Sequence, residues 1–149
     1  MPKALKFYVF CVTLAGVAII IYFFKSLDFS AVDWGGFVVF TMLTALAELL
    51  PVRLSKETLV SVGFSITFAS IIVFGPAAAV FIVFLGNAAS SLVNYKTQNI
   101  MQVLFNCNMF AIMVGCAGQV YVVFGGVPGR IIFAQPSAFI IPMLMCIVT

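Results

Sequence analysis

The feature that most constrains this chain is a series of long apolar runs separated by short polar connections. The first run extends from Phe7 to Phe24 without a charged residue, between Lys6 and Lys25. An α-helix needs about 20 apolar residues to cross the hydrocarbon core of a bilayer. Backbone polar groups inside that core must be hydrogen-bonded within the protein, which favours helices over open strands. The sequence therefore predicts an integral membrane protein built from transmembrane helices.

Composition also indicates that most of the exterior faces the hydrocarbon of a membrane. Hydrophobic residues make up 64% of the chain and charged residues 7%, whereas a soluble domain carries about a quarter charged residues. Too few charges remain to cover a water-facing surface. We expect one all-α membrane domain over residues 1–149, a bundle of about six transmembrane helices with a cytoplasmic N-terminus. The expected spans are about 7–24, 35–50, 59–74, 77–93, 100–124 and 131–149.

Prolines and glycines mark the breaks between these runs. Pro51 should end the second span, because the residue before a proline is biased away from helical angles. Gly75-Pro76 should end the third span. The third and fourth spans are short, so they either cross a locally thinned bilayer or form a re-entrant hairpin. The last run ends without a charge or polar tail, and we expect the natural chain to continue beyond residue 149.

Basic residues in the connections predict the orientation, since cytoplasmic loops are enriched in lysine and arginine. The side that carries the N-terminus has more of them than the opposite side, which carries Lys25 and Arg130. The expected location is the bacterial cytoplasmic (inner) membrane, multi-pass, with the first span as an uncleaved anchor. The basic residues on the predicted cytoplasmic side are Lys3, Lys6, Arg53, Lys56 and Lys96.

No arrangement of residues for bond chemistry is recognisable. Histidine is absent, which excludes histidine-based triads and metal sites, and neither a Walker loop nor a paired-carboxylate site occurs. The four cysteines lie in apolar runs without a CxxC motif, and we interpret them as small apolar side chains. A contact between Cys107 and Cys116 across partner chains is left open. We expect no enzymatic activity, no cofactor, no metal and no nucleic-acid partner.

Glu48 is the sharpest functional candidate, because it is the only acidic residue inside an apolar run. Thr41, Thr44 and Glu48 follow an i, i+3, i+7 spacing that puts them on one helix face. A carboxylate inside a membrane is costly and by default suggests function. The alternative is that Glu48 reaches the cytoplasmic interface or pairs with Arg53 beyond the Pro51 break.

Amides and small residues mark further helix faces. Asn87 and Asn94 in the fourth span are expected to lie near Asn106 and Asn99 of the fifth, respectively. Such amides either join helices by hydrogen bonds or form a polar ligand site. Ser61, Ser65 and Ala69 share one face of the third span, with Gly63, Thr67 and Ser70 on the neighbouring face. The full set of candidate ligand-binding or polar contact residues is Thr41, Thr44, Glu48, Ser61, Ser65, Asn87, Asn94, Gln102 and Asn106.

Four stretches carry a resemblance to a known type of module: 47–52 (AELLPV), 61–66 (SVGFSI), 74–78 (FGPAA) and 102–106 (QVLFN). Together they resemble the N-terminal membrane module of bacterial proteins that continue into an HD-GYP or GGDEF domain of cyclic-di-GMP signalling. The resemblance covers roughly residues 35 to 125. It implies a membrane sensor or anchor whose partners are the lipid bilayer and an output domain beyond residue 149, or a partner subunit. A homodimer is also compatible with it. The chain departs from the full pattern by having no output domain.

The competing interpretation is the substrate-binding membrane subunit of a vitamin-type, energy-coupling-factor-like transporter, which has a similar size and helix number. Those subunits carry a small-xxx-small pattern in the first helix, and residues 15–18 (AGVA) offer no clean repeat of that kind. A purely structural membrane subunit is a third alternative.

Overall fold

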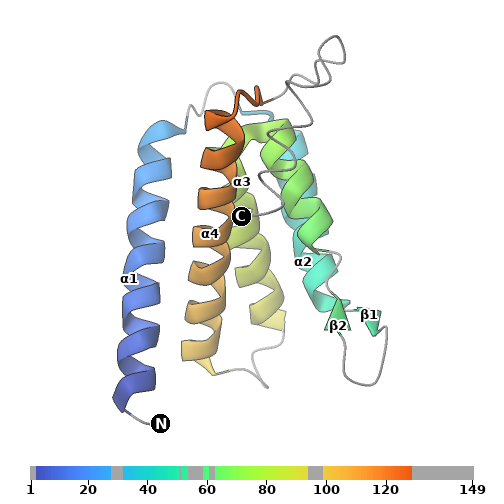
Figure 1. The fold of residues 1–149 in the computed structure, drawn as a ribbon. Helices are drawn as coiled ribbons and strands as arrows, with labels where there is room; N and C mark the ends of the chain where they lie inside the picture. Colours follow the sequence, from blue (N-terminus) through green and yellow to red (C-terminus); the bar gives the residue numbers. More distant parts are fainter. Residues whose placement is uncertain are drawn as a thin grey trace.

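The computed structural model describes residues 3–27, 32–50, 52–53, 59–60, 63–93 and 99–128. Four helices run side by side, and two very short strands lie at the same end of the bundle as the N-terminus (Figure 1). The antiparallel strands pair Val52 with Val60. The elements are α1 (Lys3–Ser26), α2 (Trp34–Leu49), β1 (Val52–Arg53), β2 (Leu59–Val60), α3 (Gly63–Val93) and α4 (Ile100–Val123).

Three helices meet the length and composition of a membrane span: Lys6–Ser26 of α1, Gly63–Val93, which is divided at Gly75, and Ile100–Val123. The fourth, Trp34–Leu49, is apolar but shorter. Large apolar side chains cover the outside of the bundle, including Phe7 at 70% exposure and Leu92 at 74%. A soluble monomer rarely exposes contiguous apolar surface of this kind. Length, composition and exterior together fit a helical membrane protein.

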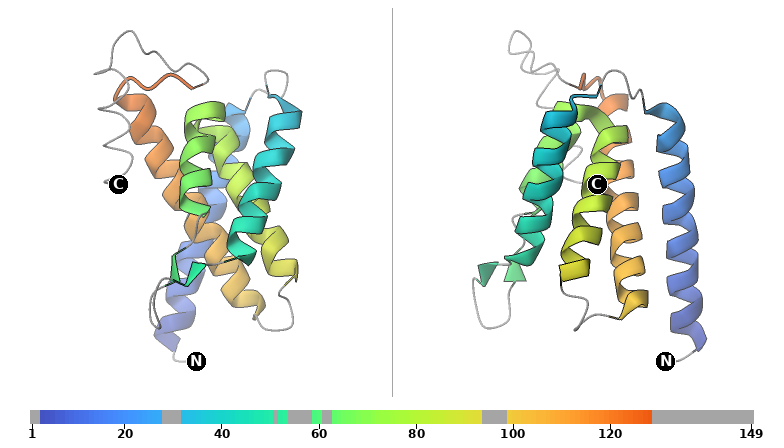
Figure 2. Two further views of the ribbon diagram at one scale, coloured as in Figure 1. Left: turned by 90° about the vertical axis from the view of Figure 1, so that its right-hand side faces the viewer. Right: turned by 180° about the vertical axis from the view of Figure 1, so that it is seen from behind.

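α3 consists of two helical halves that meet at Gly75. Gly75 has φ 84° and ψ 171°, a backbone conformation that is essentially restricted to glycine. Pro76 follows and has no N–H to continue the helical ladder. The two halves lie side by side, so the chain reverses direction there (Figure 2). The predicted break at Gly75-Pro76 is therefore present.

The span predicted to start at residue 59 begins later. Leu59 and Val60 belong to β2, and the helix starts at Gly63. The short hairpin explains this difference, because the backbones of Val52 and Val60 pair across it, and β-branched residues favour strands. The spans predicted at 35–50 and 100–124 agree with α2 and α4 to within a residue.

The predicted bundle of about six helices is not supported as such. The described residues contain four helices, one of them divided at Gly75. The predicted span 131–149 lies outside the described residues. The helical class is thus confirmed, while the number of spans stays a prediction.

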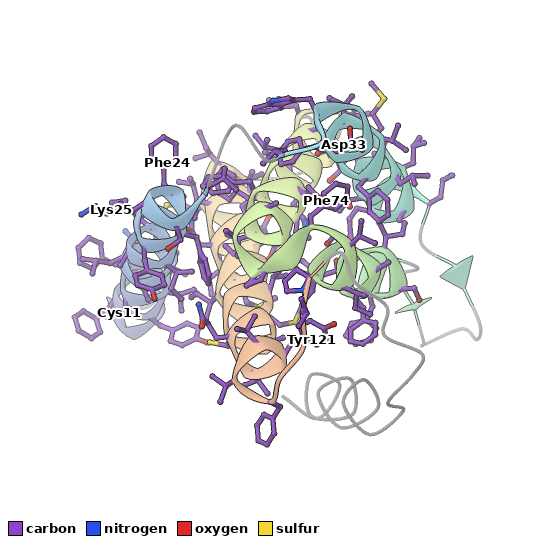
Figure 3. The ribbon with its side chains drawn as sticks, turned by 90° about the horizontal axis from the view of Figure 1, so that it is seen from above. Cys11, Phe24, Lys25, Asp33, Phe74 and Tyr121 are labelled. Carbon is purple, nitrogen blue, oxygen red and sulfur yellow. The ribbon has the colours of Figure 1, made fainter. Side chains whose placement is uncertain are left out.

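The core lies where α1, α3 and α4 meet, and α2 packs against α3. Phe74 lies between α3 and α2 (Figure 3), with its ring centroid 5.2 Å from that of Phe40. On α2, a Cβ at Gly36 would lie 2.8 Å from Phe74 Cζ, so the two helices approach closely there. The buried apolar cluster consists of Phe23, Ile71, Ala79, Val80, Val83, Ala111, Val114, Ala117 and Tyr121.

Candidate functional site

The two candidate threonines lie on α2, and the hydroxyl of each donates a hydrogen bond to a carbonyl of the same helix. Thr44 is buried, and its Oγ1 donates to the Phe40 carbonyl at 2.9 Å. Thr41 is half-buried and donates to the Phe37 carbonyl at 2.8 Å. Thr44 also packs against Gly86 of α3, where an added Cβ would lie 2.7 Å from Thr44 Cβ. Since each hydroxyl is satisfied within α2, this face is suited to close helix packing.

Glu48 is half-buried one residue before the end of α2. This position places it on the side of the bundle that carries the strands (Figure 1). The predicted pairing with the Arg53 side chain falls outside the part of the chain that the structure describes. The interfacial and the functional interpretation of Glu48 both stay predictions.

The inward face of the first half of α3 carries Gly63, Thr67 and Ser70, and it is not the face of the candidate Ser65. Ser65 is exposed, whereas Gly63, Thr67 and Ser70 are buried. Ser70 Oγ donates to the Thr67 carbonyl at 2.6 Å. Ser61 lies outside the described residues. Within the described part of the chain Ser65 is therefore not an inward contact, because α3 turns Ser70 toward the bundle.

The predicted pairing of Asn87 with Asn106 is not formed. Asn87 is buried at 6% exposure, and its Nδ2 donates to the Val83 carbonyl at 3.0 Å. Asn106 is exposed on α4, because the next residue, Cys107, is the one that turns inward. Successive helical residues are about 100° apart, so a one-residue difference moves a side chain off the interface. Asn94 lies outside the described residues.

Gln102 takes part in the cap at the start of α4. Asn99 is the N-cap, and its backbone N–H donates to Gln102 Oε1 at 3.2 Å in a capping box. This arrangement satisfies backbone donors that a helix start leaves without a partner. Gln102 is itself exposed, so a helix cap accounts for the residue better than an inward site.

Asn108 is the buried amide that the sequence analysis missed. It is 2% exposed, and its Nδ2 donates to the Leu104 carbonyl at 2.8 Å. Its Oδ1 is buried and accepts no hydrogen bond within the described part of the chain. Asn108 lies seven residues before Gly115, and a Cβ added at Gly115 would lie 2.9 Å from the Phe23 ring of α1. A seven-residue spacing keeps two residues on one helix face, and that signal could have identified Asn108.

The residues after α4 pack onto the reversal of α3. A Cβ at Gly75 would lie 3.1 Å from Pro128 Cγ, and one at Gly118 would lie 3.0 Å from Pro76 Cα. Gly126 N donates to the Tyr121 carbonyl at 2.9 Å, which folds the chain back over the end of α4. We call this group, Gly75, Pro76, Gly118, Gly126 and Pro128, the reversal junction.

An apolar recess of about 180 Å³ lies at the end of the bundle where α1 leads into α2. Its walls come from the end of α1, the connection that follows, the start of α2 and the second half of α3. Every lining residue is apolar or aromatic, which suits hydrocarbon better than a polar solute. The lining residues are Phe24, Leu27, Val32, Trp34, Phe37, Phe81 and Leu85.

Cysteines and acidic residues do not gather in the described regions. No group of three or more His, Cys, Asp or Glu side chains that could hold a metal ion occurs among the described residues. Cys107 is buried, while Cys11 and Cys116 are exposed, and all three are free thiols.

Comparison of the chain with protein families, with curated proteins and with solved structures finds no match in any of the three.

Proposed function

We propose that this chain is a non-catalytic membrane domain of a bacterial signal-transduction protein, acting as a sensor or anchor in cyclic-di-GMP signalling. In this proposal about six helices cross the inner membrane and the N-terminus is cytoplasmic. The observation that carries it is the reversal junction, where the residues that leave α4 pack directly against the turn of α3.

The junction joins packing inside the bundle to the path of the chain beyond it. Gly118 of α4 lies against Pro76, and Pro128 lies against Gly75. Because these contacts are made by backbone and proline ring atoms, there is little free space to absorb a displacement. A shift of α3 relative to α4 must therefore displace Pro128, the last residue that the structure describes. Packed elements of this kind shift between discrete arrangements and do not deform continuously.

The polar residues inside the bundle favour this role over a carrier for a polar vitamin. Thr44, Asn87 and Asn108 sit on three different helices, and each donates to a carbonyl of its own helix. A site for a polar solute needs a few polar groups that converge on one cavity. The recess near Trp34 is apolar throughout. The arrangement supports a packed domain whose helices transmit a change.

Deleting the gene in its source bacterium tests this proposal. We expect the cellular concentration of cyclic-di-GMP, measured by mass spectrometry, to change and to return to normal on complementation with the intact gene. Uptake of radiolabelled vitamins should be the same in all strains. Unchanged cyclic-di-GMP together with lost vitamin uptake would support the carrier instead.

A Gly118→Val variant makes the experiment specific for the junction. The added side chain would push against Pro76, and we expect the protein to insert normally but fail to restore cyclic-di-GMP. Gly35→Ala is the matched control, since its Cβ would meet only ordinary van der Waals distances. If Gly118→Val complements as well as Gly35→Ala, the junction does not transmit the signal.

A further inference from the structure

We propose that the outward face of α4 is the surface through which two copies of this chain pair side by side in the membrane. Five exposed residues form a stripe along this face, at alternating spacings of four and three residues. We call them the α4 stripe. α1 and α3 pack against other sides of α4 (Figure 3). The residues of the α4 stripe are Gln102, Asn106, Met109, Met113 and Cys116.

Asn106 is the residue that a purely lipid-facing helix would not carry. It is the seventh residue of α4, it is exposed, and its side chain makes no hydrogen bond with a described residue. The two buried asparagines of the described residues, Asn87 and Asn108, both donate to carbonyls of their own helices, although Asn108 Oδ1 accepts no hydrogen bond there. An amide left without a hydrogen-bond partner in hydrocarbon is unfavourable. The face around Asn106 therefore needs a polar partner.

A second copy of the chain supplies that partner. All copies insert with the same orientation, so two α4 helices related by a two-fold axis along the membrane normal place Asn106 at the same depth. An amide both donates and accepts, which lets two asparagines bond to each other across such an axis.

The rest of the stripe has the form of a helix-pairing seam. Spacings of four and three repeat every seven residues, which is the pattern of a left-handed coiled coil, and a single asparagine in such a seam specifies register and partner number. Met109 is 41% exposed and Met113 is 37% exposed. Their flexible side chains adapt well to a facing helix. Cys116 continues the seam one turn further on.

The native cysteines provide the test. In the full-length chain in membranes, Cys11→Ala, Cys107→Ala and Cys146→Ala together leave Cys116 as the only thiol. Oxidation with copper phenanthroline should convert most of this protein into a disulfide-linked dimer on a non-reducing gel. The matched control carries Cys107→Ala, Cys116→Ala and Cys146→Ala, so that Cys11 is the only thiol. Cys11 is also exposed but lies on α1, and this protein should stay monomeric. Equal cross-linking of the two proteins would overturn the proposal.

Asn106 is tested by its effect on association. Asn106→Leu should weaken the monomer–dimer equilibrium, measured by energy transfer on dilution into detergent, by about threefold to twentyfold, since an interhelical hydrogen bond in a membrane contributes about 0.6–1.7 kcal/mol. Asn106→Gln should restore most of the association. The thermal unfolding of the monomer should be the same for all three proteins. An unchanged dimer constant for Asn106→Leu would contradict the assigned role.

One further variant distinguishes two possible partners of the α4 stripe, a second copy of the chain and the chain's own residues 131–149. A protein that retains Cys116 and Cys146 should again give a dimer on oxidation. If it instead gives only a fast-migrating monomer with an internal disulfide, the segment 131–149 covers the α4 stripe and the proposal is wrong.

Discussion

The backbone of Gly16 in α1 lies directly against the side-chain amide of Asn108 in α4. A Cβ built at Gly16 would sit 2.8 Å from Asn108 Cγ, closer than real Cβ atoms approach other atoms. Higher up the same interface, Gly115 of α4 meets the Phe23 ring of α1. Glycine at such positions allows membrane helices to approach until their backbones are nearly in contact. The position of α1, whose outer surface is otherwise exposed, depends on these two glycines.

Gly16→Val should therefore loosen α1 from α4. The added side chain cannot fit beside Asn108, and overpacking of this kind costs about 1–3 kcal/mol. We expect a lower thermal unfolding temperature in detergent, measured by circular dichroism. Ala15→Val is the matched control, because Ala15 is exposed next to Gly16. Equal losses in the two variants would show that the interface does not depend on Gly16.

Asn108→Leu should leave stability within about 1 kcal/mol of the native chain, because it removes a buried acceptor without a described partner and loses only the hydrogen bond from Nδ2 to the Leu104 carbonyl. Asn108 Oδ1 is the acceptor in question. The measurement is again thermal unfolding of the purified protein. A loss of about 2 kcal/mol or more would indicate that Oδ1 has a partner in the membrane, since that is the cost of breaking a buried hydrogen bond.

Gly75→Ala should destabilise the chain by about 1–3 kcal/mol, the usual cost of forcing a residue with a side chain into a sparsely populated backbone region. The φ of 84° at Gly75 is the cause, and the contact with Pro128 leaves little room in addition. Gly35→Ala serves as the reference, and its unfolding should be unchanged. If Gly75→Ala unfolds like Gly35→Ala, the chain does not require a glycine conformation at the reversal.

The two serines of the first half of α3 make a matched pair. Ser70 is fully buried and Ser65 is exposed. Ser70→Leu should lower stability by about 1–3 kcal/mol through overpacking, whereas Ser65→Leu should be neutral in detergent and in lipid. The reverse order of the two variants would mean that α3 presents the other face to the bundle.

This pair also shows what the sequence predicts well and what it does not. The apolar runs located α1, α2 and α4, and Gly75-Pro76 located the reversal, since glycine and proline have strong local effects on the backbone. Which face of a helix turns inward is harder to predict. In a soluble protein the apolar face is the buried one, but lipid tails are as apolar as a protein core. Ser65 and Ser70 therefore gave equally good spacings in the sequence, and only packing distinguishes them.

The same reason explains why Asn106 was predicted to face inward, whereas Asn108 is the buried amide. Both are amides in an apolar run, and composition does not indicate which one turns inward. Gly115 and Gly118 were the better guide, because close approach requires small residues on the inward face. The start of α3 was missed for a local reason, since Leu59 and Val60, interpreted as the beginning of a helix, pair instead with Arg53 and Val52 as strands.

In the proposed topology the chain crosses a bilayer with the strands on the cytoplasmic side. The two ends of the bundle can be labelled separately in a cysteine-free chain that carries either Ser26→Cys, at the end of α1, or Ser55→Cys, in the connection between β1 and β2. With an impermeant maleimide on intact spheroplasts, we expect Ser26→Cys to react at once and Ser55→Cys to react only after permeabilisation. Equal reaction of both without permeabilisation, or recovery of the protein in the soluble fraction, would contradict the account.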